Sequence, residues 1–166
     1  MTFDIAVQAL VDAGVEFVLI GGWAAILNGS VHTTRDLDIC YARNIGNHVR
    51  IAAALAPFSP RPRDFPPNLP FVWDAATLNN GTTFTLTTTL GAIDLLSEVS
   101  GLGTYSAVKA ASKLVEAFGR EIWTLDLRGL IAAKRAAGRL KDLQVLPELE
   151  SLLEASEDDD PEPGTS

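Results

Sequence analysis

Two aspartates stand inside an apolar stretch of the chain, and they limit its possible folds more than any other feature. The sequence from 36 to 42 reads Asp-Leu-Asp-Ile-Cys-Tyr-Ala, which apart from the carboxylates has the composition of a buried strand. Side chains two residues apart on a strand point to the same face, so Asp36 and Asp38 lie together while Leu37 enters the core. Burying a charge is costly unless it is paired or binds a metal. The pattern therefore predicts either a polar cap at a strand end or a carboxylate pair that holds a cation.

Hydrophobic spacing along the rest of the chain alternates between helical and strand patterns. Helical spacing predicts helices over 4–13, 22–27, 45–55, 105–111, 127–137 and 141–153. Runs of β-branched and aromatic residues, or strict alternation, predict strands over 15–20, 37–41, 82–89, 92–96, 113–118 and 121–125. A segment rich in proline and arginine, 59–70, is expected to be a loop. This alternation predicts an α/β fold.

Composition indicates a globular protein. Hydrophobic residues make up 47% of the 166 residues and charged residues 20%, which is ordinary for a single folded domain. No stretch approaches the roughly 20 apolar residues of a membrane-spanning helix. The first residues lack the basic segment of a secretory signal. We therefore expect a cytoplasmic protein that does not associate with membranes.

The acidic residues are concentrated at the end of the chain. The formal net charge is −8, and six acidic residues but no basic residue lie in 154–166. Such a run predicts disorder, so we expect one domain over 1–153 and a disordered acidic tail over 154–166. The tail either solvates the protein or acts as an autoinhibitory or partner-binding segment. Eight of the thirteen lysines and arginines lie between Lys109 and Lys141.

Two further features accompany the aspartate pair. Gly21 and Gly22 follow an apolar strand and open a short helix, which predicts either a tight turn or a site where a phosphate approaches the backbone. Asp94 lies inside a second apolar strand, so three carboxylates converge if the two strands are neighbours. Their mutual repulsion would be relieved by Mg²⁺, which binds one or two carboxylates together with substrate phosphates. The combination predicts a site for a metal-bound nucleoside triphosphate.

These elements resemble a known family. The Gly21-Gly22 turn, the Thr34-x-Asp36-x-Asp38 segment and Asp94 are similar to the active-site elements of the polymerase-β-type nucleotidyltransferase superfamily. The closest resemblance is to minimal bacterial members, including the AbiEii-like toxins of toxin–antitoxin systems. The segment LRGLIAAKRAAGRLKDL, residues 127–143, is also similar to a segment of those proteins. The resemblance spans roughly residues 5–150.

The resemblance implies a fold and a set of roles. The fold would be a small mixed β-sheet with flanking helices (α+β) and a C-terminal helical extension. Asp36 and Asp38 would bind two Mg²⁺ ions, and Asp94 would complete the metal site and activate the acceptor hydroxyl. The glycine turn would hold the triphosphate, and Lys134 would reach it as a point charge.

The same resemblance assigns nucleotide-binding roles to Thr34 and to its neighbour Arg35. Many family members have an arginine at the position of His32, and Arg35 is its candidate replacement here. Gly22 stands where many members have serine, which removes one hydroxyl contact to phosphate. Arg139 and Asp142, three residues apart, are expected to form a surface ion pair.

The predicted reaction moves a nucleoside monophosphate from a Mg²⁺-bound nucleoside triphosphate to an acceptor hydroxyl and releases pyrophosphate. The acceptor stays open between RNA (a tRNA 3′ end), a protein side chain and a small molecule, and a role in a toxin–antitoxin system is implied. One alternative is a catalytically degenerate nucleotide-binding module that acts as an antitoxin or regulator. Another is an interaction protein whose acidic tail recruits a partner.

Overall fold

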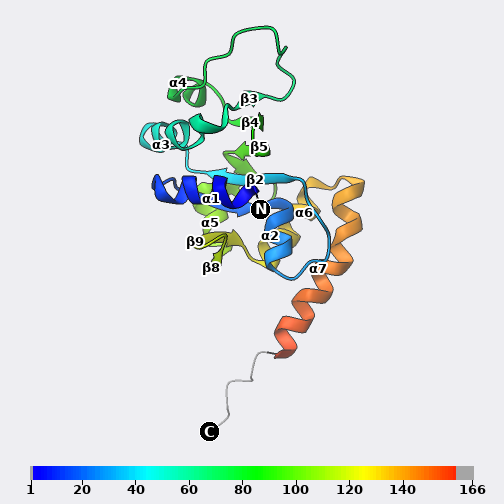
Figure 1. Ribbon diagram of the computed structural model, residues 1–166. Helices are drawn as coiled ribbons and strands as arrows, with labels where there is room; N and C mark the ends of the chain where they lie inside the picture. Colours follow the sequence, from blue (N-terminus) through cyan, green and yellow to red (C-terminus); the bar gives the residue numbers. More distant parts are fainter. Residues whose placement is uncertain (1, 160–166) are drawn as a thin grey trace.

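The computed structural model describes the backbone of residues 2–159 and has the expected mixed α/β architecture (Figure 1). Its helices are α1 (Thr2–Asp12), α2 (Gly21–Leu27), α3 (Ile45–Leu55), η1 (Ala56–Phe58, 3₁₀), α4 (Ala75–Asn79), α5 (Tyr105–Ala110), α6 (Leu127–Ala137) and α7 (Leu140–Asp159). Its strands are β1 (Phe17–Ile20), β2 (Asp36–Tyr41), β3 (Arg61–Pro62), β4 (Thr83–Thr88), β5 (Gly91–Leu96), β6 (Glu98–Val99), β7 (Gly103–Thr104), β8 (Ser112–Ala117) and β9 (Arg120–Leu125).

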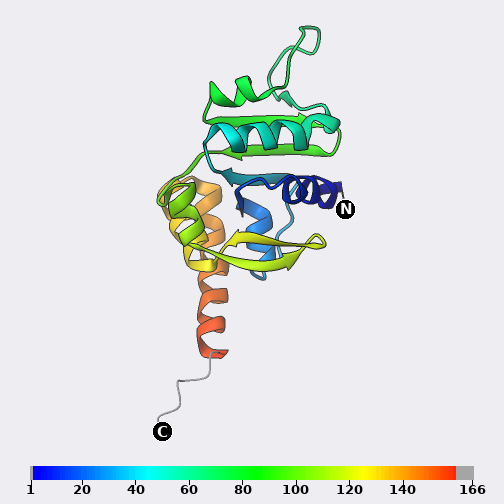
Figure 2. The same cartoon turned by 90° about the vertical axis from the view of Figure 1, so that its left-hand side faces the viewer.

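Seven of these strands form one mixed sheet in the order β3-β4-β5-β2-β1-β9-β8. Strand β2 lies at its centre, parallel to β5 and antiparallel to β1. Strands β6 and β7 form a separate two-stranded sheet. The central sheet is flanked by α1 and α3 on one side and by α6 and α7 on the other (Figures 1 and 2).

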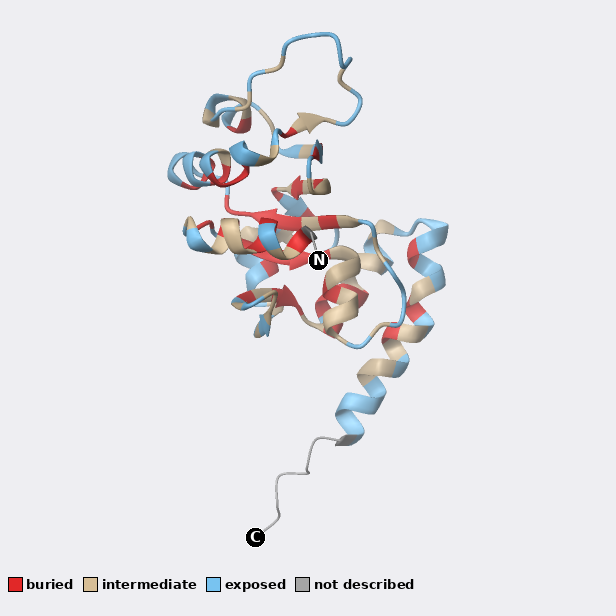
Figure 3. Cartoon of the chain, viewed as in Figure 1, coloured by how far each residue is buried: buried red, intermediate tan, exposed pale blue. Residues whose placement is uncertain are grey.

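The alternation of side chains along β2 divides the interior into two cores. Leu37 and Ile39 are fully buried in the core that also contains α1 and α3. Cys40 points the other way, into the core beneath α2, α6 and α7. Because Asp36 and Asp38 share the parity of Cys40, they stand on the face that carries α6 and α7. Figure 3 shows the buried residues gathered in these central strands.

The end of the chain differs from the prediction. The segment from 154 to 159, expected to be disordered, continues helix α7, while residues 160–166 lie outside the described residues. Leu152 and Leu153 pack against the second core, and Glu157 pairs with Arg128 of α6. The packed residues lie just before the acidic segment, whose residues 154–158 are exposed, so charge density alone did not predict where the helix ends.

The strands that the sequence did not reveal are all very short. Strand β3 lies inside the segment predicted as a loop, and β6 and β7 follow β5. Two residues are too few to show an alternating pattern, so such strands are visible only through their partners. Of the helices in residues 2–159, none combines the length and the apolar composition that a membrane crossing requires.

Candidate functional site

The three predicted carboxylates meet on neighbouring strands. Asp38 of β2 lies directly opposite Asp94 of β5, and Asp36 lies opposite Ala92 on the same face. Lateral partners in a sheet project to the same side, so the three side chains share one surface. All three are partly buried and line a cavity of about 360 Å³. The two strands are neighbours, so the condition under which the three carboxylates were expected to converge is met.

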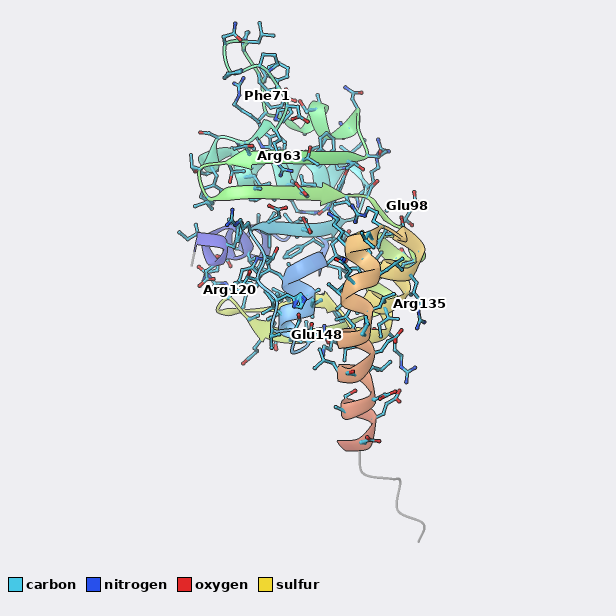
Figure 4. The ribbon with its side chains drawn as sticks, turned by 90° about the vertical axis from the view of Figure 1, so that its right-hand side faces the viewer. Arg63, Phe71, Glu98, Arg120, Arg135 and Glu148 are labelled. Carbon is cyan, nitrogen blue, oxygen red and sulfur yellow. The ribbon has the colours of Figure 1, made fainter. Side chains whose placement is uncertain are left out.

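The cavity lies between the sheet and the junction of α6 and α7. Thr83 and Thr85 of β4 extend its sheet wall, and Lys134, Arg139 and Asp142 line the helical side. Figure 4 shows this side of the molecule, where α6 and α7 cover the lower strands and leave β4 and β5 open. The site thus combines an acidic floor, a basic rim and an exposed sheet face.

Asp38 has the most perturbed electrostatics of the site. Burial raises the pKa of its carboxyl group to about 7, and the charges of Asp94 and Asp36 add to this effect. The charge of Lys134 opposes them. In addition, Asp38 Oδ1 is buried and has no hydrogen-bond partner among the described residues. An ionised carboxylate with an unsatisfied buried oxygen is suited to receive a cation.

The residues present fit a hard divalent cation that is only partly enclosed by protein. Carboxylate oxygens are ligands that Mg²⁺ prefers, and Asp36 and Asp38 lie on the same face of β2. Within residues 2–159 there is no ready-made group of three or more His, Cys, Asp or Glu side chains that encloses an ion by itself. Mg²⁺ usually completes its shell with water and substrate phosphates, so a site of this kind needs a bound nucleotide.

Sequence reasoning missed Arg63, which contacts the third carboxylate. Its Nη2 donates to Asp94 Oδ1 at 2.7 Å and to the Leu86 carbonyl at 3.1 Å, and its backbone N–H donates to Thr85. The hydrogen bond and charge of Asp94 raise the pKa of Arg63. A weak signal existed in the sequence: Arg61 and Arg63 alternate, as strand residues do, inside the proline-rich loop.

Lys134 lines the cavity and is held there by another residue. Its Nζ donates to Asp142 Oδ1 at 3.1 Å, and Arg139 Nε donates to Asp142 Oδ2 at 2.6 Å. The predicted ion pair of Arg139 with Asp142 is present, but Asp142 is fully buried, so the pair does not lie on the surface as expected. Burial alone would raise the pKa of Asp142, but hydrogen bonds from Arg139 and Lys134 lower it overall. The turn at Gly138, with φ +66°, brings α7 back onto α6 and creates this cluster.

The glycine pair is required by close packing. A Cβ on Gly21 would lie 2.3 Å from Asp38 Oδ2, and Gly21 has φ +66°. A Cβ on Gly22 would lie 2.7 Å from Thr34 Oγ1, so a serine has no room there while Thr34 keeps its position. Helix α2 has only seven residues, and the packing explains both glycines without a phosphate.

Three of the predicted nucleotide-binding residues are not among those that line the cavity. They are Gly22, Thr34 and Arg35. Thr34 Oγ1 bonds the backbone of Asp36 at 3.3–3.4 Å and so fixes the entry into β2. Arg35 is exposed. The structure therefore brings together Gly21, Asp36, Asp38, Asp94 and Lys134.

Replacing Gly21 by alanine is expected to destabilise the protein far more than replacing Gly14. Both glycines have positive φ, +66° and +76°, but a Cβ on Gly14 meets nothing closer than 3.8 Å. The backbone strain common to both costs about 1–3 kcal/mol. The Gly21 variant must also displace Asp38, which we expect to add about 1–3 kcal/mol, as overpacking does. Denaturant unfolding measures the free energy of unfolding of both variants. An equal loss of stability in the two variants would contradict the packing described for Gly21.

Comparisons with known proteins leave the family open. No protein-family model matches the chain, and no curated protein matches it.

Proposed function

We propose that the protein is a nucleotidyltransferase that moves a nucleoside monophosphate from a nucleoside triphosphate to an acceptor hydroxyl. The observation that carries the proposal is the lateral pairing of Asp38 with Asp94, with Asp36 on the same face of one cavity. Lys134 on the opposite wall adds a cation suited to phosphate. The cytoplasmic location and the toxin–antitoxin role that we also propose rest on the sequence alone.

The carboxylates would hold the metal. Asp36 and Asp38 would provide the main ligands, with Asp94 beside them, and the unpartnered Oδ1 of Asp38 supports this assignment. When bound, Mg²⁺ would neutralise phosphate charge during an in-line displacement.

The chain's own residues would carry the remaining steps. The acceptor oxygen forms a bond to the α-phosphorus while the bond from that phosphorus to the bridging oxygen breaks, and pyrophosphate leaves. Asp94 would take the proton of the acceptor hydroxyl, because it stands at the open side of the carboxylate group, next to Thr85. Lys134 would contact the phosphates, and Asp142 would orient it through their 3.1 Å contact.

Mg²⁺ and nucleoside triphosphate are expected to bind together and much more weakly apart. The protein offers few ligands, so phosphate oxygens must complete the metal shell, and the metal must offset the carboxylate charge that faces the phosphates. Titration calorimetry with each nucleoside triphosphate, with Mg²⁺ and with EDTA, measures the coupling. We expect at least about a tenfold gain in affinity with Mg²⁺. Equal affinity under both conditions would exclude this metal site.

The acceptor can be identified by label transfer. Purified protein is incubated with a cell extract and each nucleoside triphosphate labelled at the α-phosphate, and the labelled product is then digested with ribonuclease or protease. A parallel reaction with nucleoside triphosphate labelled at the γ-phosphate separates nucleotidyl from phosphoryl transfer. Nucleotidyl transfer leaves only the α-label on the acceptor, whereas phosphoryl transfer leaves only the γ-label. The Asp36→Asn, Asp38→Asn double variant is the negative control. Absence of α-label on any acceptor would contradict the proposed reaction.

A nucleotide-binding module without turnover is the second candidate, and one observation favours it. Both groups that would act on substrate already have protein partners, since Asp94 is paired with Arg63 and Lys134 with Asp142. Such a module would serve as an antitoxin or regulator. It predicts Mg²⁺-dependent nucleotide binding in calorimetry but no α-label on any acceptor.

A further inference from the structure

A basic side chain, Arg63, contacts one of the three carboxylates that share the sheet face of the cavity. Within residues 2–159, Arg63 is the basic residue that lies within ion-pair distance of Asp36, Asp38 or Asp94, and it contacts Asp94. Its side chain is 37% exposed whereas that of Asp94 is 18% exposed. The guanidinium is therefore the more exposed partner of the pair.

Arg63 sits where the chain leaves the sheet. The preceding strand β3 pairs with β4, and the backbone N–H of Arg63 still donates to the Thr85 carbonyl. The following segment, 64–72, projects beyond the sheet at the top of Figure 1, and most of its residues are exposed. The side chain of Arg63 thus holds one end of a projecting segment against the site (Figure 4).

We propose that Arg63 is a built-in counterion of the carboxylates of Asp36, Asp38 and Asp94, which a divalent cation displaces from Asp94, so that metal loading frees both Asp94 and the side chain of Arg63. The inference rests on the metal site of the proposed function. A guanidinium and a divalent cation repel each other, so a metal ion held by Asp36 and Asp38 disfavours the guanidinium beside Asp94. Arg63 keeps Asp94 engaged while the metal is absent and releases it when the metal is present. In this order of events, Asp94 is paired with Arg63 before the metal binds and can accept a proton afterwards.

Metal affinity in the absence of nucleotide gives the first test. Binding of Mn²⁺ alone is followed by the electron paramagnetic resonance signal of the free ion in the parent, Arg63→Gln and Arg63→Lys. We expect Arg63→Gln to bind Mn²⁺ about tenfold or more tightly than the parent, since a cation beside a carboxylate changes its proton affinity by about 10–1,000-fold. Arg63→Lys should resemble the parent because it keeps the charge.

Arg61→Gln is the matched control. The side chain of Arg61 donates to the Pro66 and Leu69 carbonyls of the same segment, so its loss loosens the segment but leaves the charge beside Asp94. Its Mn²⁺ affinity should equal that of the parent. If Arg63→Gln binds Mn²⁺ no more tightly than the parent, the inference is overturned while the metal site stands. If no variant binds Mn²⁺, even with ATP, both the metal site and the inference are overturned.

Trypsin reports the release of Arg63 directly. The bond after Arg61 resists trypsin because Pro62 follows, and the nearest other basic residues in the chain are Arg50 and Lys109. Cleavage between residues 63 and 64 therefore yields diagnostic fragments. We expect saturating Mn²⁺ to accelerate this cleavage several-fold in the parent while cleavage after Lys109 stays constant. In metal-free protein, Asp94→Asn should accelerate it similarly. An unchanged rate at residue 63 in both cases overturns the inference.

Discussion

Replacing Asp94 by asparagine is expected to abolish transfer of α-label while Mg²⁺–nucleotide binding stays within a few-fold of the parent. The amide cannot accept the acceptor proton, and loss of a general base costs about 10²–10⁴-fold in rate. The Asp36→Asn, Asp38→Asn double variant should lose both binding and transfer, because these side chains would hold the metal. Single-turnover label transfer and titration calorimetry separate the two effects.

Asp94→Asn also removes the ion-pair partner of Arg63, so a second variant is needed that breaks this pair but keeps Asp94. Arg63→Gln leaves the base intact and should therefore retain transfer. Thr85→Ala changes the residue that pairs with Asp94 across β4 and β5 and should have a small effect on both measurements. An Asp94→Asn variant as active as the parent would show that this carboxylate is not the base.

The metal-free protein is expected to become more stable when Asp38 is replaced by asparagine. Burial and two neighbouring carboxylates raise the pKa of Asp38 to about 7, so its ionised form at pH 8 opposes folding. A shift of about three pKa units corresponds to at most about 4 kcal/mol. We expect the Tm of Asp38→Asn at pH 8 in EDTA to exceed that of the parent by about 5 °C or more, given about 2–4 °C per kcal/mol for a chain of this size.

The stabilisation of the metal-free protein by Asp38→Asn should increase with pH. A carboxyl group with a raised pKa in the folded state supports folding fully below its unfolded pKa and loses this contribution as the pH rises through about 7. The stabilisation by Asp38→Asn should thus be absent near pH 4 and largest above pH 7. Saturating Mg²⁺ with nucleotide should reverse it, because only the parent gains binding energy. Equal Tm values across this range would contradict the electrostatics described for Asp38.

Asp142 supplies a matched control from the same cavity. It is also buried, but its pKa is lowered because Arg139 and Lys134 bond its carboxylate. Asp142→Asn should therefore destabilise the protein at neutral pH, where the ionised parent is favoured. The difference in stability between the parent and Asp142→Asn should become smaller as the pH falls through the lowered pKa of Asp142. Two aspartates that line one cavity thus respond oppositely to the same substitution, because Asp38 faces other carboxylates and Asp142 faces cations.

The sequence by itself determined most of the local structure. Helices α3 and α6 begin and end where their spacing predicts, since Asp126 caps α6 through its bond to the Gly129 N–H and proline follows soon after α3. The alternation along β2 likewise placed Asp36 and Asp38 on one face. These features depend on neighbours within a few residues, which is the range over which caps, turns and periodicity act.

Only the tertiary structure decided which distant residues meet. That β5 lies beside β2, that Arg63 pairs with Asp94, and that Asp142 is buried follow from contacts between segments far apart in the chain. The helix that continues through 154–159 is likewise anchored by the packing of Leu152 and Leu153 on the second core. Local propensity does not encode such pairings, because their stability comes from surfaces that exist only once the sheet and its helices have assembled. The sequence therefore identified Asp36, Asp38 and Asp94, whereas only the fold showed that Arg63 lies beside Asp94.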